Sequence, residues 1–142
     1  MAGGKGSNAP EWGRLIFRMI VGGGMMTHGW PKVFGVTDAG VRNIVGFTQY
    51  VAKIGFPYPN YFAWAAALSE LVGGAMLILG FGTRVAAFGI ACTMAVAAWT
   101  DRAGGWKEME LAALYLAPAL FLLLGGPGKK SLDAIYFTRK SG

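Results

Sequence analysis

The sequence is poor in the residues that hold metals, form disulfides or carry charge. It contains one cysteine and one histidine. A single cysteine excludes a disulfide within the chain and any Cys-x-x-Cys redox or zinc motif. With so few ligands, a transition-metal site made by the protein alone is not expected. Charged residues make up only 14% of the chain, against about 25% in an average soluble domain. These shortages argue against a disulfide framework, a zinc protein and an ordinary soluble domain.

Apolar residues, in contrast, are abundant and make up 54% of the 142 residues. A single domain of this length with so little charge is typical of an integral membrane protein. The net charge is +6, and the basic residues flank the apolar runs instead of forming one cluster. This distribution favours anionic lipid, and not nucleic acid, as the partner of the positive charge.

One apolar stretch, Tyr61 to Gly80, carries a single charged residue, Glu70, near its middle. About 20 residues at about 1.5 Å each are enough for a helix to cross the hydrocarbon core of a bilayer. A carboxylate at that depth is costly unless it finds a partner, a wet cavity or a proton. The residues on its face are mostly small, which predicts a closely packed neighbouring helix. A proton or ligand site and a purely structural ion pair or hydrogen bond both remain open.

The apolar runs predict an all-α fold, an integral membrane four-helix bundle with a short amphipathic helix between the first and second spans. The short helix is expected to begin at a capping Asp38 and to continue to about Lys53. A disordered tail is expected over residues 1–11, the membrane domain over 12–128 and a basic tail over 129–142. The four predicted spans cover residues 12–30, 61–80, 83–100 and 107–124.

Polar residues along the first predicted span and just beyond its end recur at helical spacing and share one face, and they include Arg18, His28 and Lys32. Judged by depth alone, Glu70 lies at the level of about Val21, one turn outward of Arg18, so Arg18 is expected to pair with it. His28 lies about 10 Å further out, where Glu110 of the last span could project beside it. These placements predict a polar mouth above a buried Glu70–Arg18 pair, suited to a quinone head group or a similar lipophilic molecule. His28 and Glu110 can equally well hydrogen-bond helix ends and water.

The basic residues also predict an orientation. With four spans, both termini lie on one side of the membrane. The basic residues on that side are Lys5, Arg14, Arg84, Lys129, Lys130, Arg139 and Lys140, and those on the other side are Lys32, Arg42, Lys53, Arg102 and Lys107. Because cytoplasmic loops carry the excess of Lys and Arg, we expect a multi-pass protein of the inner (plasma) membrane with both termini in the cytoplasm.

Several short motifs follow one another at characteristic spacings over about residues 14–133. They are Arg14-Leu15, His28-Gly29-Trp30-Pro31-Lys32, Ile54-Gly55-Phe56-Pro57, Glu70-Leu71-Val72-Gly73-Gly74, Leu79-Gly80, Thr83-Arg84, the run Glu110 to Leu124, Gly125-Gly126-Pro127-Gly128 and Ser131-Leu132-Asp133. In order and spacing they resemble the DoxX family of small bacterial and archaeal membrane proteins.

The resemblance implies a four-span bundle in which His28, Lys32, Glu70, Arg84 and Asp133 are family-type positions. It also implies a redox association. Relatives form the membrane part of a thiosulfate:quinone oxidoreductase, or join membrane-bound oxidoreductase complexes linked to oxidative-stress defence. A family name supports the fold more directly than the function.

Three functions follow as hypotheses. The first is a membrane subunit of a quinone-linked oxidoreductase, with no covalently bound cofactor and no activity alone, in which Glu70 and His28 carry protons. The residues expected at its ligand site are Arg18, Lys32, Glu110 and Arg84. The second is a non-catalytic anchor or accessory subunit of a larger complex. The third is a small-molecule transporter acting as a dimer, although no internal repeat indicates one. Each has lipid and either another subunit or a second copy as partner.

Overall fold

The computed structural model describes residues 8–139, without the side chains of 137–139. Residues 1–7 of the predicted tail and residues 140–142 lie outside the described part. Within it there are six α-helices, one short 3-10 helix and no β-strand, which confirms the predicted all-α fold. The elements are α1 (Ala9–Phe34), α2 (Asn43–Lys53), α3 (Pro59–Leu79), α4 (Thr83–Asp101), η1 (Arg102–Gly104), α5 (Trp106–Gly125) and α6 (Leu132–Arg139).

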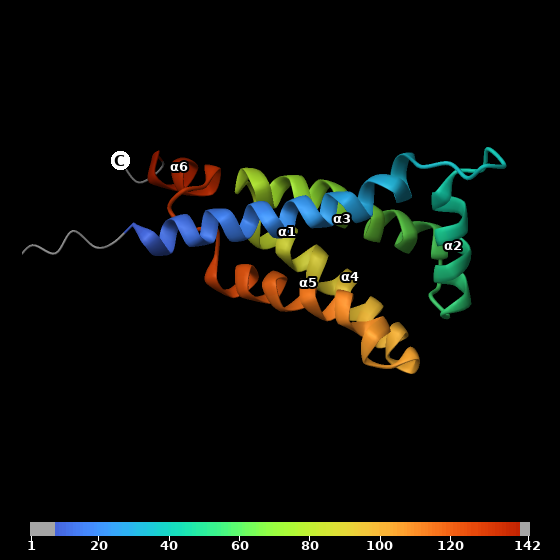
Figure 1. Ribbon diagram of the computed structural model, residues 1–142. Coiled ribbons are helices and arrows are strands. Elements are labelled where there is room, and N and C mark those ends of the chain that lie inside the picture. The colour runs from blue at the N-terminus through green and yellow to red at the C-terminus, as the bar shows by residue number, and fades with distance from the viewer. Residues whose placement is uncertain (1–7, 140–142) are drawn as a thin grey trace, which may run out of the picture.

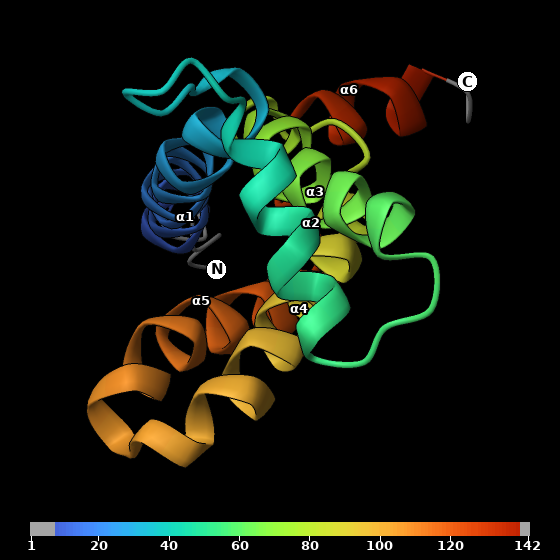
Figure 2. The same cartoon turned by 90° about the vertical axis from the view of Figure 1, so that its right-hand side faces the viewer.

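The four long helices lie alongside one another in an antiparallel arrangement (Figure 1). Helix α1 packs along α3, α3 packs along α4, and α4 packs along α5, whereas α1 and α5 meet over a short stretch only. Helix α2 crosses one end of this bundle, in front of α3 and α4 (Figure 2). We call this the α2 end. The start of α1 and helix α6 lie at the opposite end, which we call the termini end.

Three segments within residues 8–139 are long and apolar enough to cross a membrane, namely Pro59–Leu79, Thr83–Gly104 and Trp106–Gly125. They correspond to three of the four predicted spans. Helix α1 is longer, with 26 residues, but is not among them. It carries several charged side chains and a run of three glycines. Its crossing of the membrane remains a prediction, which its packing along α3 supports.

The first helix continues through Pro31 to Phe34, so it ends four residues later than predicted. Helix α2 begins at Asn43, and the prediction that Asp38 caps it is wrong. A tight turn occupies this position, because the Gly40 N–H donates to the Thr37 carbonyl at 2.8 Å. Gly40 has φ +75°, a left-handed conformation that glycine adopts without strain and that interrupts a helix.

Glycines set how closely α1 and α3 approach and where they meet along their lengths. A Cβ added at Gly22 would lie 2.5 Å from the Gly74 carbonyl oxygen, and one added at Gly29 would lie 2.5 Å from the Leu71 nitrogen. Backbone therefore touches backbone at two points, a contact that only small residues permit. This register places Glu70 beside the C-terminal half of α1.

Two apolar clusters hold the helices together. The larger lies between the long helices and includes the buried side chains of Met25, Leu77, Ile90 and Leu122. The smaller lies at the α2 end and consists of the buried side chains of Val33, Ile44, Val51, Ala63 and Ala67. Because the second cluster combines α1, α2 and α3, it holds α2 across the end of the bundle.

Candidate functional site

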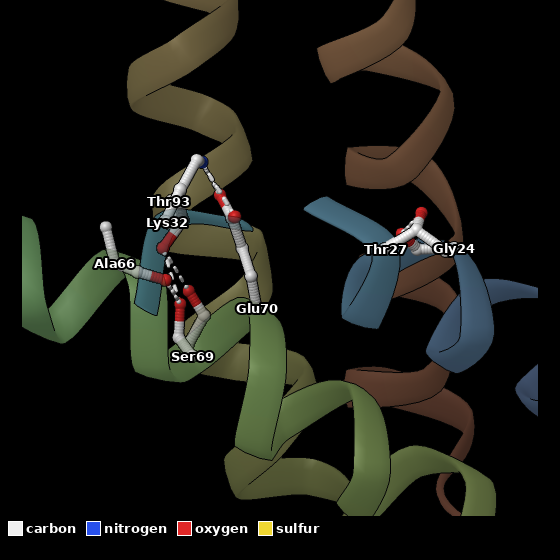
Figure 3. Close-up of polar contacts among 8 residues, drawn as sticks. Gly24, Thr27, Lys32, Ala66, Ser69, Glu70 and Thr93 are labelled. Atoms are coloured by element: carbon white, nitrogen blue, oxygen red, sulfur yellow. Dashed lines mark hydrogen bonds and ion pairs between the residues drawn. The ribbon is translucent and has the colours of Figure 1, made fainter. Parts of the chain in front are cut away.

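The charged residue in the middle of α3 has a partner at the end of α1. Lys32 Nζ lies 2.7 Å from both Oε1 and Oε2 of Glu70 (Figure 3). The Glu70 side chain is 1% exposed and the Lys32 side chain 28%. Donation from one ammonium to both carboxylate oxygens offsets much of the cost of burying the anion. Lys32 Nζ also lies 4.5 Å from the centroid of the Phe47 ring in α2, so this pair connects three helices.

The predicted pair between Glu70 and Arg18 is wrong. Arg18 is buried at the termini end, where its guanidinium donates to the carbonyl oxygen of Pro127 and, at 2.8 Å, to that of Lys130. The register of α1 against α3 explains the error. Gly29 lies against Leu71, so Glu70 is about eight residues, or about 12 Å, from the depth assumed by placing it level with Val21.

Two further family-type positions lie at the termini end. The Asp133 carboxylate accepts hydrogen bonds from the backbone N–H groups of Gly82 at 2.7 Å and Thr83 at 2.9 Å. It thereby caps the first turn of α4, where a negative charge is stabilised. Arg84 is exposed beside this turn. Asp133 therefore has a structural role, and Arg84 lies far along the bundle from Glu70.

A cavity of about 360 Å³ lies between α2, α3 and α4, with the Lys32–Glu70 pair in its wall. Its volume falls within the range of about 300–1,000 Å³ that is typical of small-molecule sites. Its walls are mostly apolar. The polar residues that line it are Lys32, Tyr50, Ser69, Glu70, Thr93 and Thr100. A mostly apolar cavity with a few converging polar groups suits a lipophilic ligand that carries polar oxygens.

A pair of hydroxyl groups forms a second polar position on the cavity wall. Ser69 Oγ and Thr93 Oγ1 are 2.8 Å apart, and they also lie 2.8 and 3.0 Å from the carbonyl oxygens of Ala66 and Gly89 (Figure 3). Two hydroxyls have only two hydrogens for these three contacts. Only two of the three contacts can therefore be hydrogen bonds at one time, and at least one hydroxyl hydrogen has a choice between two acceptors. A ligand oxygen in the cavity can accept that hydrogen at little cost.

The predicted polar mouth formed by His28 and Glu110 is also wrong. The His28 ring faces α5, with its centroid 5.5 Å from that of Tyr115, and Glu110 is exposed. Neither residue lines the cavity. Four residues turn a helix by about 40° more than one full turn. Lys32 therefore points to α3 while His28, on the same predicted stripe, points to α5.

Two residues on the cavity wall that sequence reasoning overlooked carry recognisable signals. Ser69 directly precedes Glu70, and Thr93 lies between Gly89 and Ala97 in a row of small residues at i+4 spacing. A hydroxyl within a row of small residues faces the neighbouring helix, where it can hydrogen-bond across the interface. That pattern could have indicated the Ser69–Thr93 contact.

Most of this chain matches the model of one known protein family. The DoxX model matches residues 13–102, well over half of the chain. The chain belongs to the DoxX family. The matched segment contains both members of the Lys32–Glu70 pair and every residue that lines the cavity.

Three curated relatives, each 30% identical, support the assignment of this DoxX chain. One is "Putative oxidoreductase CatD" of Bacillus subtilis, with 92% of this chain and 91% of that protein covered. Another is "Inner membrane protein YphA" of Escherichia coli, with 84% and 86% covered. A third is "Uncharacterized membrane protein Rv3486" of Mycobacterium tuberculosis, with 90% and 90% covered. No solved structure matches. The protein is therefore a helical DoxX membrane protein that lies in a lipid bilayer.

Proposed function

We propose that this DoxX protein is the membrane subunit of a quinone-linked oxidoreductase and that its cavity binds the quinone head group. The observation that carries the proposal is the cavity of about 360 Å³ with a buried ion pair in an otherwise mostly apolar wall. The name of the Bacillus subtilis relative, which describes that protein as an oxidoreductase, supports a redox association.

The polar groups of the cavity match the chemistry of a quinone, a flat ring with two carbonyl oxygens. The Lys32 ammonium and the Ser69–Thr93 hydroxyl pair are hydrogen-bond donors on the cavity wall. Conversion of a quinone to a quinol takes two electrons and two protons. A partner subunit with its own redox cofactor would supply the electrons, and Lys32 would stabilise negative charge on the quinone oxygen. Glu70 would exchange protons with water in the cavity.

The proposed orientation places the cavity in the outer half of the membrane. The start of α1 and helix α6 lie at the same end of the bundle (Figure 1). We assign that end to the cytoplasm, because it carries more Lys and Arg than the α2 end. The cavity lies toward the α2 end, since α2 forms part of its wall. The partner of the proposed complex would be a soluble subunit or a second copy of this chain.

The test is direct binding of a short-chain quinone to purified protein in nanodiscs made from quinone-free lipid. Ala97 and Ala95 are both in α4, but only Ala97 lines the cavity and Ala95 is exposed. Ala97→Phe fills the cavity, and we expect it to weaken binding by roughly tenfold or more, the loss of about 1.4 kcal/mol. Ala95→Phe is the matched control and should bind as the wild type does. Equal binding by both variants, or no binding by the wild type, would sink the proposal.

A non-catalytic anchor is the second candidate function. It is favoured by the fact that Lys32 and Glu70 satisfy each other and connect α1 to α3 without any ligand. An anchor predicts that substitutions of this pair lower thermal stability or assembly with the partner subunit. It also predicts that no purified form of the protein binds a quinone, which separates it from the first candidate.

A further inference from the structure

The wall of the cavity is partly open to the outside, and the exposed residues of its lining show where. Phe62 and Ala65 of α3 and Cys92 of α4 line the cavity and are all exposed. Ala65 precedes Glu70 by five residues, which turns it by about 140° around α3, away from α1 and its Lys32. The opening therefore lies between α3 and α4, on the side that faces away from α1. We call Phe62, Ala65 and Cys92 the rim.

The deepest part of the rim lies at the middle of two membrane-spanning helices. Cys92 is nine residues from either end of α4, and Ser69 is ten residues from either end of α3. Both therefore lie about 14–15 Å from the helix ends. Helices α3 and α4 belong to the segments that are long and apolar enough to cross a membrane. Side chains exposed at that depth contact acyl chains and not water, so the opening faces the hydrocarbon of the bilayer.

The packing of α3 against α4 explains why this space exists. A Cβ added at Gly89 would lie 3.2 Å from the Ser69 Cβ, and the hydroxyls of Ser69 and Thr93 are 2.8 Å apart. The two helices therefore touch at their midpoints. Between this contact and the α2 end, the side chains of both helices that line the cavity are mostly small, namely Ala65, Ala66, Val96 and Ala97. They leave a space between the helices, and α2 lies across its end (Figure 2).

The volume of the cavity limits how much of a ligand it can hold. At about 360 Å³ it is close to the lower limit of small-molecule sites, about 300 Å³. A single substituted ring fills such a space, and a tail of several isoprene units has to lie outside it. A phospholipid is a poor occupant, because its charged head group stays at the membrane surface and its acyl chain offers no partner to the polar groups of the cavity.

We infer that the rim is a lateral opening through which the ligand enters from the bilayer, and that the apolar tail of the bound ligand lies along Phe62, Ala65 and Cys92. The polar head reaches Lys32 and the Ser69–Thr93 hydroxyl pair, while the tail stays in lipid. The inference rests on the proposed function and adds that the quinone is a long-tailed one. Because the tail is surrounded by hydrocarbon both before and after binding, it adds little to the affinity.

The position of the tail is tested with two quinones that have the same ring, one with a short tail and one with a long polyprenyl tail. Both are titrated into the full chain in nanodiscs of quinone-free lipid, and affinity is expressed as the mole fraction of quinone in the lipid. The wild type should bind the two quinones with affinities that agree within about threefold.

A bulky side chain at the rim should discriminate between the two quinones. Ala65→Trp should weaken binding of the long-tailed quinone by roughly tenfold or more, and binding of the short-tailed one by less than about threefold. Leu68→Trp is the matched control, because Leu68 is exposed on α3 but does not line the cavity. It should bind both quinones as the wild type does.

Three results would overturn the lateral opening while the proposed function stands. The first is a wild type that binds the short-tailed quinone but not the long-tailed one, since such a site has no exit for the tail. The second is an equal loss of both quinones in Ala65→Trp, which shows a distorted cavity. The third is a variant that binds both as the wild type does, which places the tail elsewhere. If the wild type binds neither quinone, the proposed function fails, and the inferred position of the tail fails with it.

The opening itself can be tested without a ligand, because Cys92 is the single cysteine of the chain. A nitroxide spin label is attached to Cys92 in nanodiscs. Its collision rate with oxygen, which concentrates in hydrocarbon, is compared with that of a neutral, water-soluble nickel chelate. Oxygen should dominate, as it should for a label at Ala95→Cys in a Cys92→Ser background, since Ala95 is exposed on the same helix. Dominance of the nickel chelate at Cys92 would show an aqueous surface and overturn the lateral opening, whatever the quinones do.

Discussion

Lys32 and Glu70 form an asymmetric ion pair, in which a partly exposed cation neutralises a fully buried anion. Lys32 Nζ is 2.7 Å from both carboxylate oxygens, yet 28% of the lysine side chain is accessible against 1% of the glutamate side chain. If its partner is removed, a lysine at a helix end can extend its ammonium toward the interface. A carboxylate in the middle of α3 has no such escape. The two residues are therefore not equally replaceable.

Lys32→Met should destabilise the protein more than Glu70→Gln. The methionine variant leaves a buried carboxylate without a partner, and removal of one member of a buried pair costs about 3–5 kcal/mol. Glu70→Gln leaves an amide that still accepts a hydrogen bond, and Lys32 can turn outward. The melting temperature in detergent, followed by intrinsic tryptophan fluorescence, checks the order. The double variant is the control and should recover most of the stability lost in Lys32→Met. A larger loss in Glu70→Gln would contradict this account.

Substitution of the glycines between α1 and α3 should separate the helices. An added Cβ at Gly22 would lie 2.5 Å from a backbone oxygen of α3, and one at Gly74 would lie 2.6 Å from a backbone oxygen of α1. Backbone cannot move aside cheaply, so Gly22→Ala and Gly74→Ala should each cost about 1–3 kcal/mol. Gly23→Ala is the matched control, since nothing lies within 4 Å of its added Cβ. It should be neutral or stabilising by roughly 0.5–1 kcal/mol, as alanine is the better helix former. Equal melting temperatures for all three variants would show that α1 and α3 do not pack backbone against backbone at Gly22 and Gly74.

Loss of the Asp133 carboxylate should loosen the turn between α3 and α4. Asp133→Ala removes both acceptors from the N–H groups of Gly82 and Thr83. Helix caps are worth about 0.5–2 kcal/mol, so faster hydrogen exchange is expected at these two amides and in the first turn of α4. Asp38→Ala, in an exposed turn at the other end of the bundle, should leave these amides unchanged. Unaltered exchange in Asp133→Ala would remove the capping role.

Arg18 should hold the segment between α5 and α6 against the bundle. Its guanidinium binds the carbonyl oxygens of Pro127 and Lys130, and hydrogen bonds to a charged group contribute about 1.5–3 kcal/mol each. Arg18→Met should therefore expose the peptide bonds after Lys129 and Lys130 to trypsin, and limited proteolysis followed by mass spectrometry measures the rate. Arg102→Met, at the α2 end, serves as the control. If trypsin cuts both variants at the wild-type rate, Arg18 does not secure this segment.

The fold was largely predictable, whereas the composition of the site was not. Three of the predicted spans match helices with the length and hydropathy to cross a membrane. The end of α3 was placed within one residue, at Gly80 instead of Leu79. The spans were predictable because an apolar run bounded by glycine and proline lies within one short stretch of sequence, and that stretch alone indicates where the helix begins and ends. Asp38 failed as a cap because Gly40 takes a left-handed conformation two residues later. The positive φ of Gly40 belongs to the turn that begins at Thr37. The helical spacing of the apolar residues that follow did not reveal this turn.

The sequence by itself determined that Glu70 would be buried among helices, because a carboxylate in an apolar stretch of this length has nowhere else to lie. Only the tertiary structure decided which cation neutralises it. Arg18 and Lys32 occupy the same polar stripe of α1, and the choice between them depends on the register of two helices far apart in sequence. That register is fixed where Gly22 meets Gly74 and Gly29 meets Leu71. Such contacts depend on the fit of two backbones, which no single stretch of sequence encodes.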